Sequence, residues 1–328
     1  MKTMTTILTA FLLGVFSSAV SLAQQPAGDS SDARAAADAQ WQRINAIPDT
    51  PGTGPFPAMK EEVPSLPNHV VYRPRDLDRL DGTRLGLYVF GNGACSDDGA
   101  SARLHLLEIA SHGFIAIAPG RIRNGPGATA PPSRPRRPEG DPPQFPPPPT
   151  THKDLLAALD WALAQNADPA SPFHGKLDPE AVAVSGFSCG GIQALEIAAD
   201  PRVKTVVVMN SGLFTDGSRI TGMDAPKSLL ETLHTPTLYI LGGESDIAYA
   251  NGMDDFARIN HVPVMVANLD VGHGGTYWEP NGGAAAAVTV AWLKWQLRGD
   301  ADAAKWFVGS DCRLCTDPAW KVQKKRID

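Results

Sequence analysis

The chain has 328 residues and a formal net charge of −6. An acidic balance of this kind argues against nucleic acid and anionic membranes as partners, because both carry negative charge. The length suits one large α/β domain with a well-buried core, even after a short leader is removed.

The N-terminus has the pattern of an export signal. Lys2 precedes an apolar run over residues 7–20, and Ser21, Leu22 and Ala23 end it with the small residues that a signal peptidase requires. We expect residues 1–23 to be cleaved, with a retained N-terminal anchor as the alternative. No other stretch approaches the roughly 20 apolar residues of a membrane span. The mature chain is therefore expected to be a secreted or periplasmic monomer without membrane contact.

Residues 24–66 are rich in Ala, Asp, Gly and Pro, show no sustained apolar period, and are predicted to be a leader segment without chemistry. From His69 onward, short apolar runs alternate with helical stretches, which indicates a mainly parallel sheet with crossover helices on both faces. Strands are predicted over residues 70–72, 85–90, 114–118, 181–185, 205–209, 237–241 and 263–269. Helices are predicted over residues 101–111, 153–165, 191–199, 249–259 and 284–297. These elements make one α/β domain over residues 67–300, followed by a tail over residues 301–328 whose basic stretch at 321–326 is interpreted as a solvated end.

A Pro-rich segment interrupts this alternation at residues 121–150, with eleven prolines and five arginines. It can form neither a helix nor a central strand, because proline lacks the N–H that both require. The segment follows the strand predicted at 114–118, so it leaves from the carboxyl edge of the sheet, where ligands bind in open α/β folds. Two interpretations stay open: a semi-rigid rim whose arginines meet an acidic substrate group, or a surface insertion without function.

The strongest chemical signal is the sequence Gly-Phe-Ser-Cys-Gly at residues 186–190, between a short apolar strand and a good helix. A sharp strand-to-helix turn needs glycines beside the serine, because the backbone there is strained and crowded. The helix N-terminus behind the turn favours developing negative charge. We therefore predict that Ser188 is a nucleophile.

A serine hydroxyl is a weak nucleophile and needs a base, so we ask which of the eight histidines reaches the same edge of the sheet. Seven of them precede predicted strands or lie in or beside helices: His69, His105, His112, His152, His174, His234 and His261. His273 follows a predicted strand directly, in the Gly-His-Gly-Gly loop at residues 272–275. It is the predicted base.

The acid of such a site lies between the serine and the histidine in chain order and also follows a strand. Asp246, in Gly-Gly-Glu-Ser-Asp at residues 242–246, satisfies both conditions. Its role would be to hold one tautomer of the imidazole and to stabilise the imidazolium. Glu244 and Asp216 are the competing candidates.

Acyl transfer also needs N–H donors aimed at the oxyanion. The amide of Cys189, directly after Ser188, supplies one, and the amide of Ala94 or Cys95, in the glycine-containing loop after the strand at 85–90, supplies the other. Two amides that converge on one oxygen at roughly 3 Å leave their Cα atoms within the roughly 4.4–6.8 Å that a disulfide spans. We therefore predict a Cys95–Cys189 bridge, with two free buried thiols as the alternative.

The other two cysteines, Cys312 and Cys315, complete an even number, which in an exported protein favours disulfides. The Cys-x-x-Cys spacing also fits a redox or metal motif, but no histidine or second cysteine pair accompanies it. We predict a local disulfide that clamps the C-terminal tail.

The elbow at 186–190, the acid loop at 242–246 and the histidine loop at 272–275 resemble those of the α/β-hydrolase superfamily, nearest the dienelactone-hydrolase-like and the cutinase-like or polyester-hydrolase-like serine esterases. The resemblance covers residues 67–300 and implies a covalent acyl-enzyme mechanism with no cofactor and no metal. It also implies a small-molecule or polymeric ester as substrate. The Pro-rich insertion, Cys189 after the serine and the cysteine-containing tail depart from these esterases.

The expected function is therefore that of an exported serine ester hydrolase. Phe187, Tyr277 and Trp278 lie close to the reacting residues in sequence, and are candidates either for an apolar wall of the substrate site or for plain packing. A serine peptidase or acyltransferase with the same three groups is one alternative. A hydrolase fold that binds without catalysis is another, because fold does not dictate activity.

Overall fold

The computed structural model describes residues 39, 41–132, 147–215, 220–221 and 223–328. The predicted export signal and residues 133–146 of the Pro-rich segment lie outside this part of the chain. None of the helices in the described residues combines the length and the apolar character needed to cross a membrane. Residues 43–328 belong to one unit.

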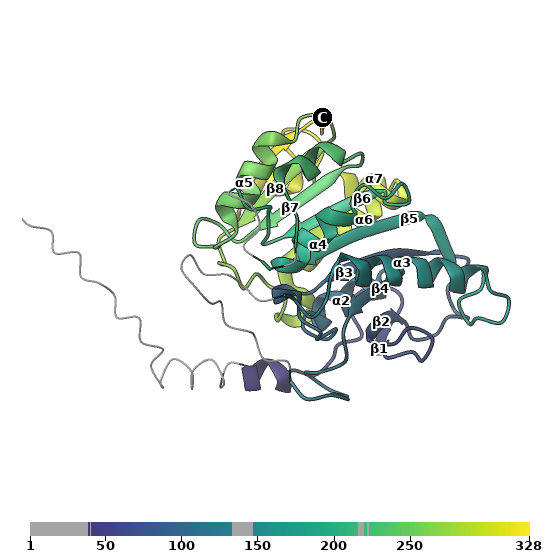
Figure 1. The fold of residues 1–328 in the computed structure, drawn as a ribbon. Helices are drawn as coiled ribbons and strands as arrows, with labels where there is room; N and C mark the ends of the chain where they lie inside the picture. The colour runs from purple at the N-terminus through teal and green to yellow at the C-terminus, as the bar shows by residue number, and fades with distance from the viewer. Residues whose placement is uncertain (1–38, 40, 133–146, 216–219, 222) are drawn as a thin grey trace, which may run out of the picture. The chain divides into compact units, whose positions relative to one another are not determined.

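A nine-stranded mixed sheet runs through this unit in the order β1-β2-β4-β3-β5-β6-β7-β8-β9 (Figure 1). The strands from β3 to β8 pair in parallel, whereas β1, β2 and β9 add to the two edges antiparallel. The bounds are β1 (Ala58–Glu61), β2 (His69–Pro74), β3 (Leu85–Gly91), β4 (Phe114–Pro119), β5 (Leu177–Phe187), β6 (Thr205–Met209), β7 (Thr237–Leu241), β8 (Val264–Leu269) and β9 (Trp320–Lys325). The prediction of an α/β domain with a mainly parallel sheet is confirmed.

Helices pack on both faces of the sheet. The bounds on one face are α3 (His152–Ala167), α4 (Cys189–Ile197) and α5 (Tyr249–Arg258), and on the other α2 (Arg103–Ser111) and α6 (Gly283–Arg298). Short elements complete the set: η1 (Gly93–Cys95), η2 (Lys227–Thr232), η3 (Pro280–Gly282), α7 (Ala301–Ala304) and α8 (Arg313–Thr316). All seven residues of β3 are buried, as expected for a strand covered on both sides.

The N-terminal edge corrects one prediction. Ala58–Glu61, inside a leader segment predicted to be either ordered on the surface or loose and to contain no strand, forms β1 and pairs with β2. The chain before it is fastened by Arg103, which is 1% exposed and donates hydrogen bonds to Asp49 and to the backbone carbonyl groups of Ile44 and Ile47. A four-residue edge strand with one buried side chain carries no apolar period, so the sequence pattern does not reveal it.

The C-terminal edge of the sheet corrects a second prediction. The basic stretch at 321–326, interpreted as a solvated end, belongs mostly to β9, which pairs with β8 along its length. Lys325 Nζ donates to the carbonyl groups of Phe256 and Ala257 in the last turn of α5, and a cation is stabilised at that end of a helix. Lysines are common on edge strands because they discourage pairing with other chains.

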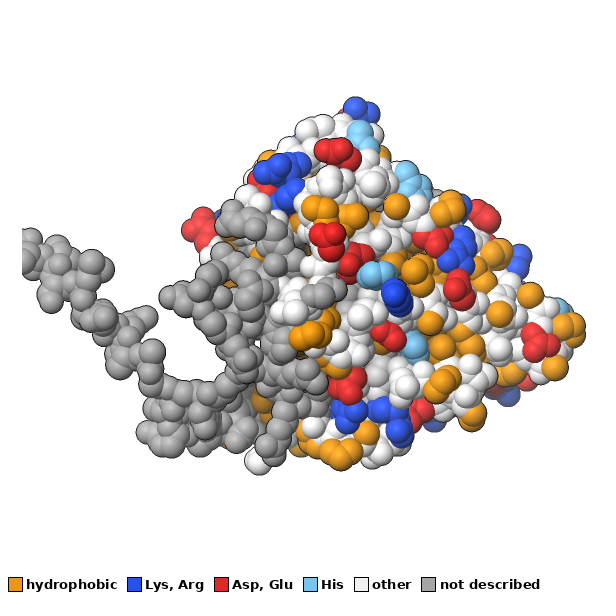
Figure 2. Space-filling view, in the orientation of Figure 1, with side chains coloured by type: hydrophobic (Ala, Val, Ile, Leu, Met, Phe, Trp, Pro, Cys, Tyr) orange, Lys and Arg blue, Asp and Glu red, His pale blue; other side chains and the backbone are white. Residues whose placement is uncertain are grey.

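The two arginines at the start of the Pro-rich segment pair within the protein. Arg121 Nε lies 2.9 Å from Glu62, and an Arg123 nitrogen lies 2.6 Å from Asp97. The other arginines of the segment, at positions 134, 136 and 137, lie outside the described residues. On the face drawn in Figure 2, acidic and basic side chains of the described residues are interspersed among apolar ones.

The core on the α6 face is built around Trp292, whose side chain is fully buried. Its ring meets the rings of Trp295 and Phe307 edge-on, with centroid distances of 5.3 and 5.1 Å. Its indole N–H donates to the Thr205 hydroxyl of β6 over 2.7 Å. Trp292 thus ties α6 and the C-terminal segment to the centre of the sheet.

We expect Trp292→Ala to lower the free energy of unfolding by about 3–5 kcal/mol, because the change leaves a cavity and removes a partner of Thr205. Urea denaturation followed by circular dichroism measures this change. The control is Lys305→Ala at a side chain that is 76% exposed, where a change within about 0.5 kcal/mol is expected. Equal effects of the two substitutions would contradict the central role of Trp292.

Candidate active site

Ser188 lies at the turn between β5 and α4, at the carboxyl edge of the parallel strands. Its backbone has φ 54° and ψ −123°, a combination that side chains with a Cβ rarely adopt. The turn is crowded: a Cβ added to Gly186 would lie 2.1 Å from the carbonyl oxygen of Gly190, and one added to Gly190 would lie 2.1 Å from the backbone of Gly91. The glycines on either side of Ser188 are therefore sterically required, as predicted from the sequence.

His273 lies in the loop that follows β8, and its ring connects two of the predicted residues. Nε2 is 2.9 Å from Ser188 Oγ, and Nδ1 is 2.6 Å from Asp246 Oδ1. With an ionised carboxylate, Nδ1–H donates to Asp246 and Nε2 accepts the hydroxyl proton of Ser188. The structure thus brings together all three residues, although 85 and 27 positions separate the pairs in sequence.

Asp246 follows β7, and its carboxylate is fully buried. Burial raises the pKa of a carboxyl group, but hydrogen bonds from His273, the amides of Ala248 and Gly242, and the Asn210 side chain outweigh this effect. The pKa of Asp246 therefore lies below its ordinary value, and the carboxylate stays ionised beside the imidazole.

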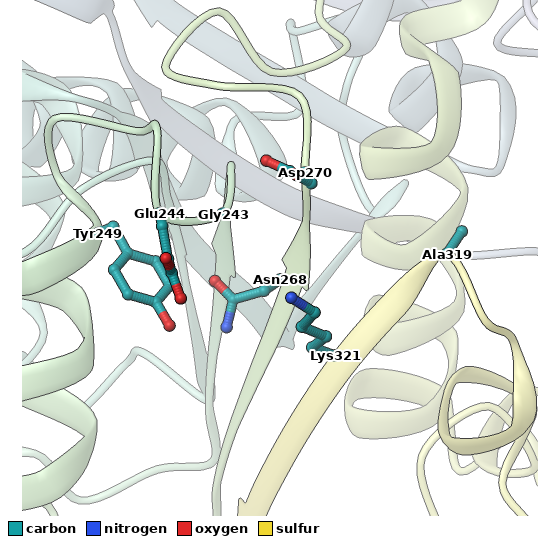
Figure 3. A pocket seen from close by; sticks show the side chains of 7 residues that line it. All are labelled: Gly243, Glu244, Tyr249, Asn268, Asp270, Ala319 and Lys321. Atoms are coloured by element: carbon teal, nitrogen blue, oxygen red, sulfur yellow. The ribbon is translucent and has the colours of Figure 1, made fainter.

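The competing acids occupy other places. Glu244 lines a separate cavity of about 130 Å³, together with Tyr249, Asn268, Asp270 and Lys321 (Figure 3). His273 Nδ1 bonds to Asp246 instead. Asp216 lies outside the described residues. The geometry thus favours Asp246 over Glu244.

The first loop at this edge, after β3, presents amides to the same region. Cys95 N–H donates to the Asn92 carbonyl over 3.1 Å, so the alternative that Cys95 supplies the oxyanion donor is corrected: its amide is occupied within η1. The amides of Ala94 and Cys189 have no acceptor among the described residues. Ala94 has φ 55°, in the left-handed region that residues with a Cβ rarely adopt. Ala94 and Cys189 thus remain as the two free donors.

Both predicted disulfides are present. Cys95 and Cys189 are bridged, with their Cα atoms 5.2 Å apart, and Cys312 and Cys315 form the local pair. The first bridge fastens the loop after β3 to the start of α4. The amides of Ala94 and Cys189 therefore belong to two segments that are covalently joined.

Of the three aromatic candidates, one is corrected. Tyr277 is 1% exposed and donates its hydroxyl proton to Asn210 over 2.7 Å, so it supports the site from behind and is no substrate wall. Phe187 is half-buried and lies 5.3 Å from the His273 ring, centroid to centroid. Trp278 is half-buried as well, and its indole N–H donates to the Ser101 carbonyl. Phe187 and Trp278 keep their place as candidates.

Sequence reasoning missed Asn210 and Ser211, which follow β6 directly. Asn210 bonds to Asp246, and the Ser211 hydroxyl donates to the Ser188 carbonyl over 2.6 Å. The available signal was their position, because polar residues that follow an apolar strand at the carboxyl edge lie beside the other loops of that edge. Among the excluded histidines, His105 is fully buried beside Tyr88, and burial lowers its pKa to about 3.

No protein-family model matches this chain, and no curated protein matches it in sequence. Within the described residues, no group of three or more His, Cys, Asp or Glu side chains is placed to hold a metal ion.

The two disulfides differ in the length of chain that they close, and we expect them to differ in their contribution to stability. The Cys95–Cys189 bridge spans 94 positions and Cys312–Cys315 spans 3. In the chain-entropy model, loss of the long bridge costs about 4–5 kcal/mol and loss of the short one about 2 kcal/mol. The paired variants Cys95→Ala/Cys189→Ala and Cys312→Ala/Cys315→Ala, compared by guanidinium denaturation under oxidising conditions, test this order. A larger loss in the second pair would contradict it.

Proposed function

We propose that this protein is an exported serine hydrolase of the α/β-hydrolase type, which cleaves carboxylic esters through an acyl-enzyme intermediate. The observation that carries the proposal is the continuous chain of hydrogen bonds from Ser188 Oγ through the His273 ring to Asp246. Its support includes the strained strand-to-helix turn at Ser188 and the chain order of serine, acid and histidine. The two disulfides favour an oxidising compartment, and thus export.

In the proposed first step, the Ser188 hydroxyl attacks the ester carbonyl carbon while His273 Nε2 takes its proton. Asp246 keeps Nδ1 protonated, so that Nε2 is the nitrogen free to accept, and its negative charge stabilises the imidazolium. Because Asp246 is fully buried and hydrogen-bonded on both oxygens, its orientation needs no rearrangement during the step.

The carbonyl oxygen becomes an oxyanion in this step, and we assign the amides of Ala94 and Cys189 to it. Cys189 is the first residue of α4, so the positive end of the helix dipole adds to the stabilisation. The Cys95–Cys189 bridge fixes the separation between the two segments before substrate arrives. Donors held in place in this way stabilise the transition state without a cost in reorganisation.

Collapse of the tetrahedral intermediate expels the alcohol, which receives its proton from His273 Nε2. Water then enters, gives a proton to the same nitrogen and attacks the carbonyl carbon of the Ser188 ester. The second tetrahedral intermediate breaks its bond to Ser188 Oγ, which takes that proton back from His273 Nε2, and the carboxylic acid leaves. The substrate is a small-molecule or polymeric ester, and every proton transfer is served by side chains of this chain. Phe187 and Trp278 are the proposed apolar contacts of the substrate.

We expect a fluorophosphonate probe to label the wild-type protein at Ser188, because the probe reacts with a serine that a histidine activates. Ser188→Ala and His273→Ala should resist labelling. Intact-mass spectrometry followed by peptide mapping measures the adduct. A folded wild-type protein that stays unlabelled would argue for the alternative of a binding protein without catalysis.

Asp246→Asn should lower kcat for p-nitrophenyl butyrate by about 10,000-fold, because an amide holds the wrong tautomer of the histidine. Glu244→Gln is the matched control, since Glu244 stands two positions earlier in the same loop and faces a different cavity, and its kcat should stay within about twofold of wild type. If the Gln variant loses activity and the Asn variant keeps it, the acid is misassigned.

Peptide anilides assayed beside p-nitrophenyl esters of increasing chain length separate esterase from peptidase activity. We expect ester cleavage to exceed anilide cleavage at every chain length. Faster anilide cleavage would favour the peptidase alternative, and acyl transfer to added alcohols in place of water would favour an acyltransferase.

A further inference from the structure

Asn210 occupies a fixed and unusual position. It follows β6, which lies between β5, the strand that leads to Ser188, and β7, the strand that leads to Asp246. Asn210 is buried, with 2% of the residue exposed. Its backbone N–H donates to the Ile240 carbonyl over 2.7 Å. Its φ of 44° lies in the left-handed region, which asparagine tolerates better than most residues. Both the backbone and the side chain are therefore held.

The Asn210 side chain uses both of its polar atoms on the loops of the candidate site. Nδ2 donates to Asp246 Oδ2 over 2.8 Å and to the carbonyl of Gly272, the residue before His273, over 3.2 Å. Oδ1 accepts from the Tyr277 hydroxyl over 2.7 Å. One amide thus connects the acid loop to the histidine loop on both sides of His273.

Glycines in those two loops make room for this amide. A Cβ added to Gly242 would lie 2.0 Å from the Gly272 carbonyl oxygen and 2.9 Å from Asn210 Nδ2. One added to Gly275 would lie 2.4 Å from the Tyr277 ring and 3.0 Å from Asn210 Oδ1. Larger residues at these positions would push apart the two loops and the side chains that meet at Asn210.

Tyr277 holds the oxygen end of the Asn210 amide. Burial, and then the nearby Tyr88 and Asp246, raise the pKa of Tyr277 well above its ordinary value, so its oxygen keeps its proton. Asp246 Oδ2 and the Gly272 carbonyl can only accept, so Nδ2 faces them and Oδ1 is left for the Tyr277 hydroxyl, which donates to it. In the reversed orientation, the amide oxygen would face two acceptors with no proton between them.

We propose that Asn210 and Tyr277 are positioning residues for the reaction: the tyrosine hydroxyl anchors the amide, and the amide aligns Asp246 with His273. The inference rests on the proposed function, because it assigns to these residues an effect on the relay at Ser188. Neither residue touches the reacting atoms. They restrict the range of positions that the Asp246 carboxylate and the His273 imidazole can occupy.

The test uses Tyr277→Phe, Asn210→Gly and the double variant, each in the full mature chain. Phenylalanine removes only the hydroxyl, and glycine removes the amide while it accepts the positive φ at position 210. Tyr72→Phe is the matched control, because Tyr72 is also buried and its hydroxyl donates over 2.7 Å, but to the Gly99 carbonyl.

We expect kcat for p-nitrophenyl butyrate to fall about 10-fold in Tyr277→Phe and about 100-fold in Asn210→Gly, with KM nearly unchanged, because misplacement of a catalytic group by about 1 Å costs up to about 100-fold. The double variant should match Asn210→Gly, since the tyrosine acts through the asparagine. Tyr72→Phe should keep the wild-type kcat. Multiplicative losses in the double variant, or wild-type kcat in both single variants, would overturn the proposal.

A second readout separates this inference from the proposed function. The proton shared by His273 Nδ1 and Asp246 gives a far-downfield resonance in the proton NMR spectrum, which requires no turnover. We expect this resonance to shift or broaden in Tyr277→Phe and to stay unchanged in Tyr72→Phe. An unperturbed resonance in Tyr277→Phe would overturn the positioning role even if the enzyme is active. A wild-type protein that shows the resonance but resists fluorophosphonate would overturn the proposed function instead.

Discussion

The close approach of two backbone segments, at Gly91 and Gly190, is the constraint on which the site depends. Any Cβ at Gly190 would overlap the backbone of Gly91, so the end of β3 and the first turn of α4 meet without side chains between them. That contact places Ser188 on its strained turn and brings the loop after β3 beside the first amide of α4. The Cys95–Cys189 bridge makes the same contact covalent. Glycine contact and disulfide act on the same pair of segments.

The buried carboxylate of Asp246 is the second requirement. A charge removed from water is costly unless hydrogen bonds replace its hydration, and here four donors do so. Two of the donors are backbone amides of its own loop, at Gly242 and Ala248. The same set of hydrogen bonds therefore stabilises the charge of Asp246 and fixes the orientation of the carboxylate toward His273.

The sequence predicts those parts of the structure that have a period or a steric signature. The strands at 205–209 and 237–241 each begin with a threonine and then continue with apolar or aromatic residues, and their predicted bounds match β6 and β7. The glycines around Ser188 and His273 likewise mark the loops that carry chemistry. The edge strands β1 and β9 lack such a signature, because each has a single buried residue and neither sustains an apolar alternation. Asn210 was missed because a buried amide has no motif: its contacts appear only once its partners from the acid loop and the histidine loop are brought together.

The strand order places the loop after β6 among the loops that carry Ser188, Asp246 and His273. β5, β6, β7 and β8 are consecutive neighbours, and the loops that follow them carry Ser188, Asn210, Asp246 and His273. The imidazole reaches from β8 back across β7 and β6 to meet the serine, so its path crosses the end of β6. A side chain there faces the carboxylate and the histidine loop at once, whereas a water molecule in its place would bring neither a fixed orientation nor a covalent anchor. An amide suits this position, since it donates to the carboxylate and accepts from a phenol without a charge of its own.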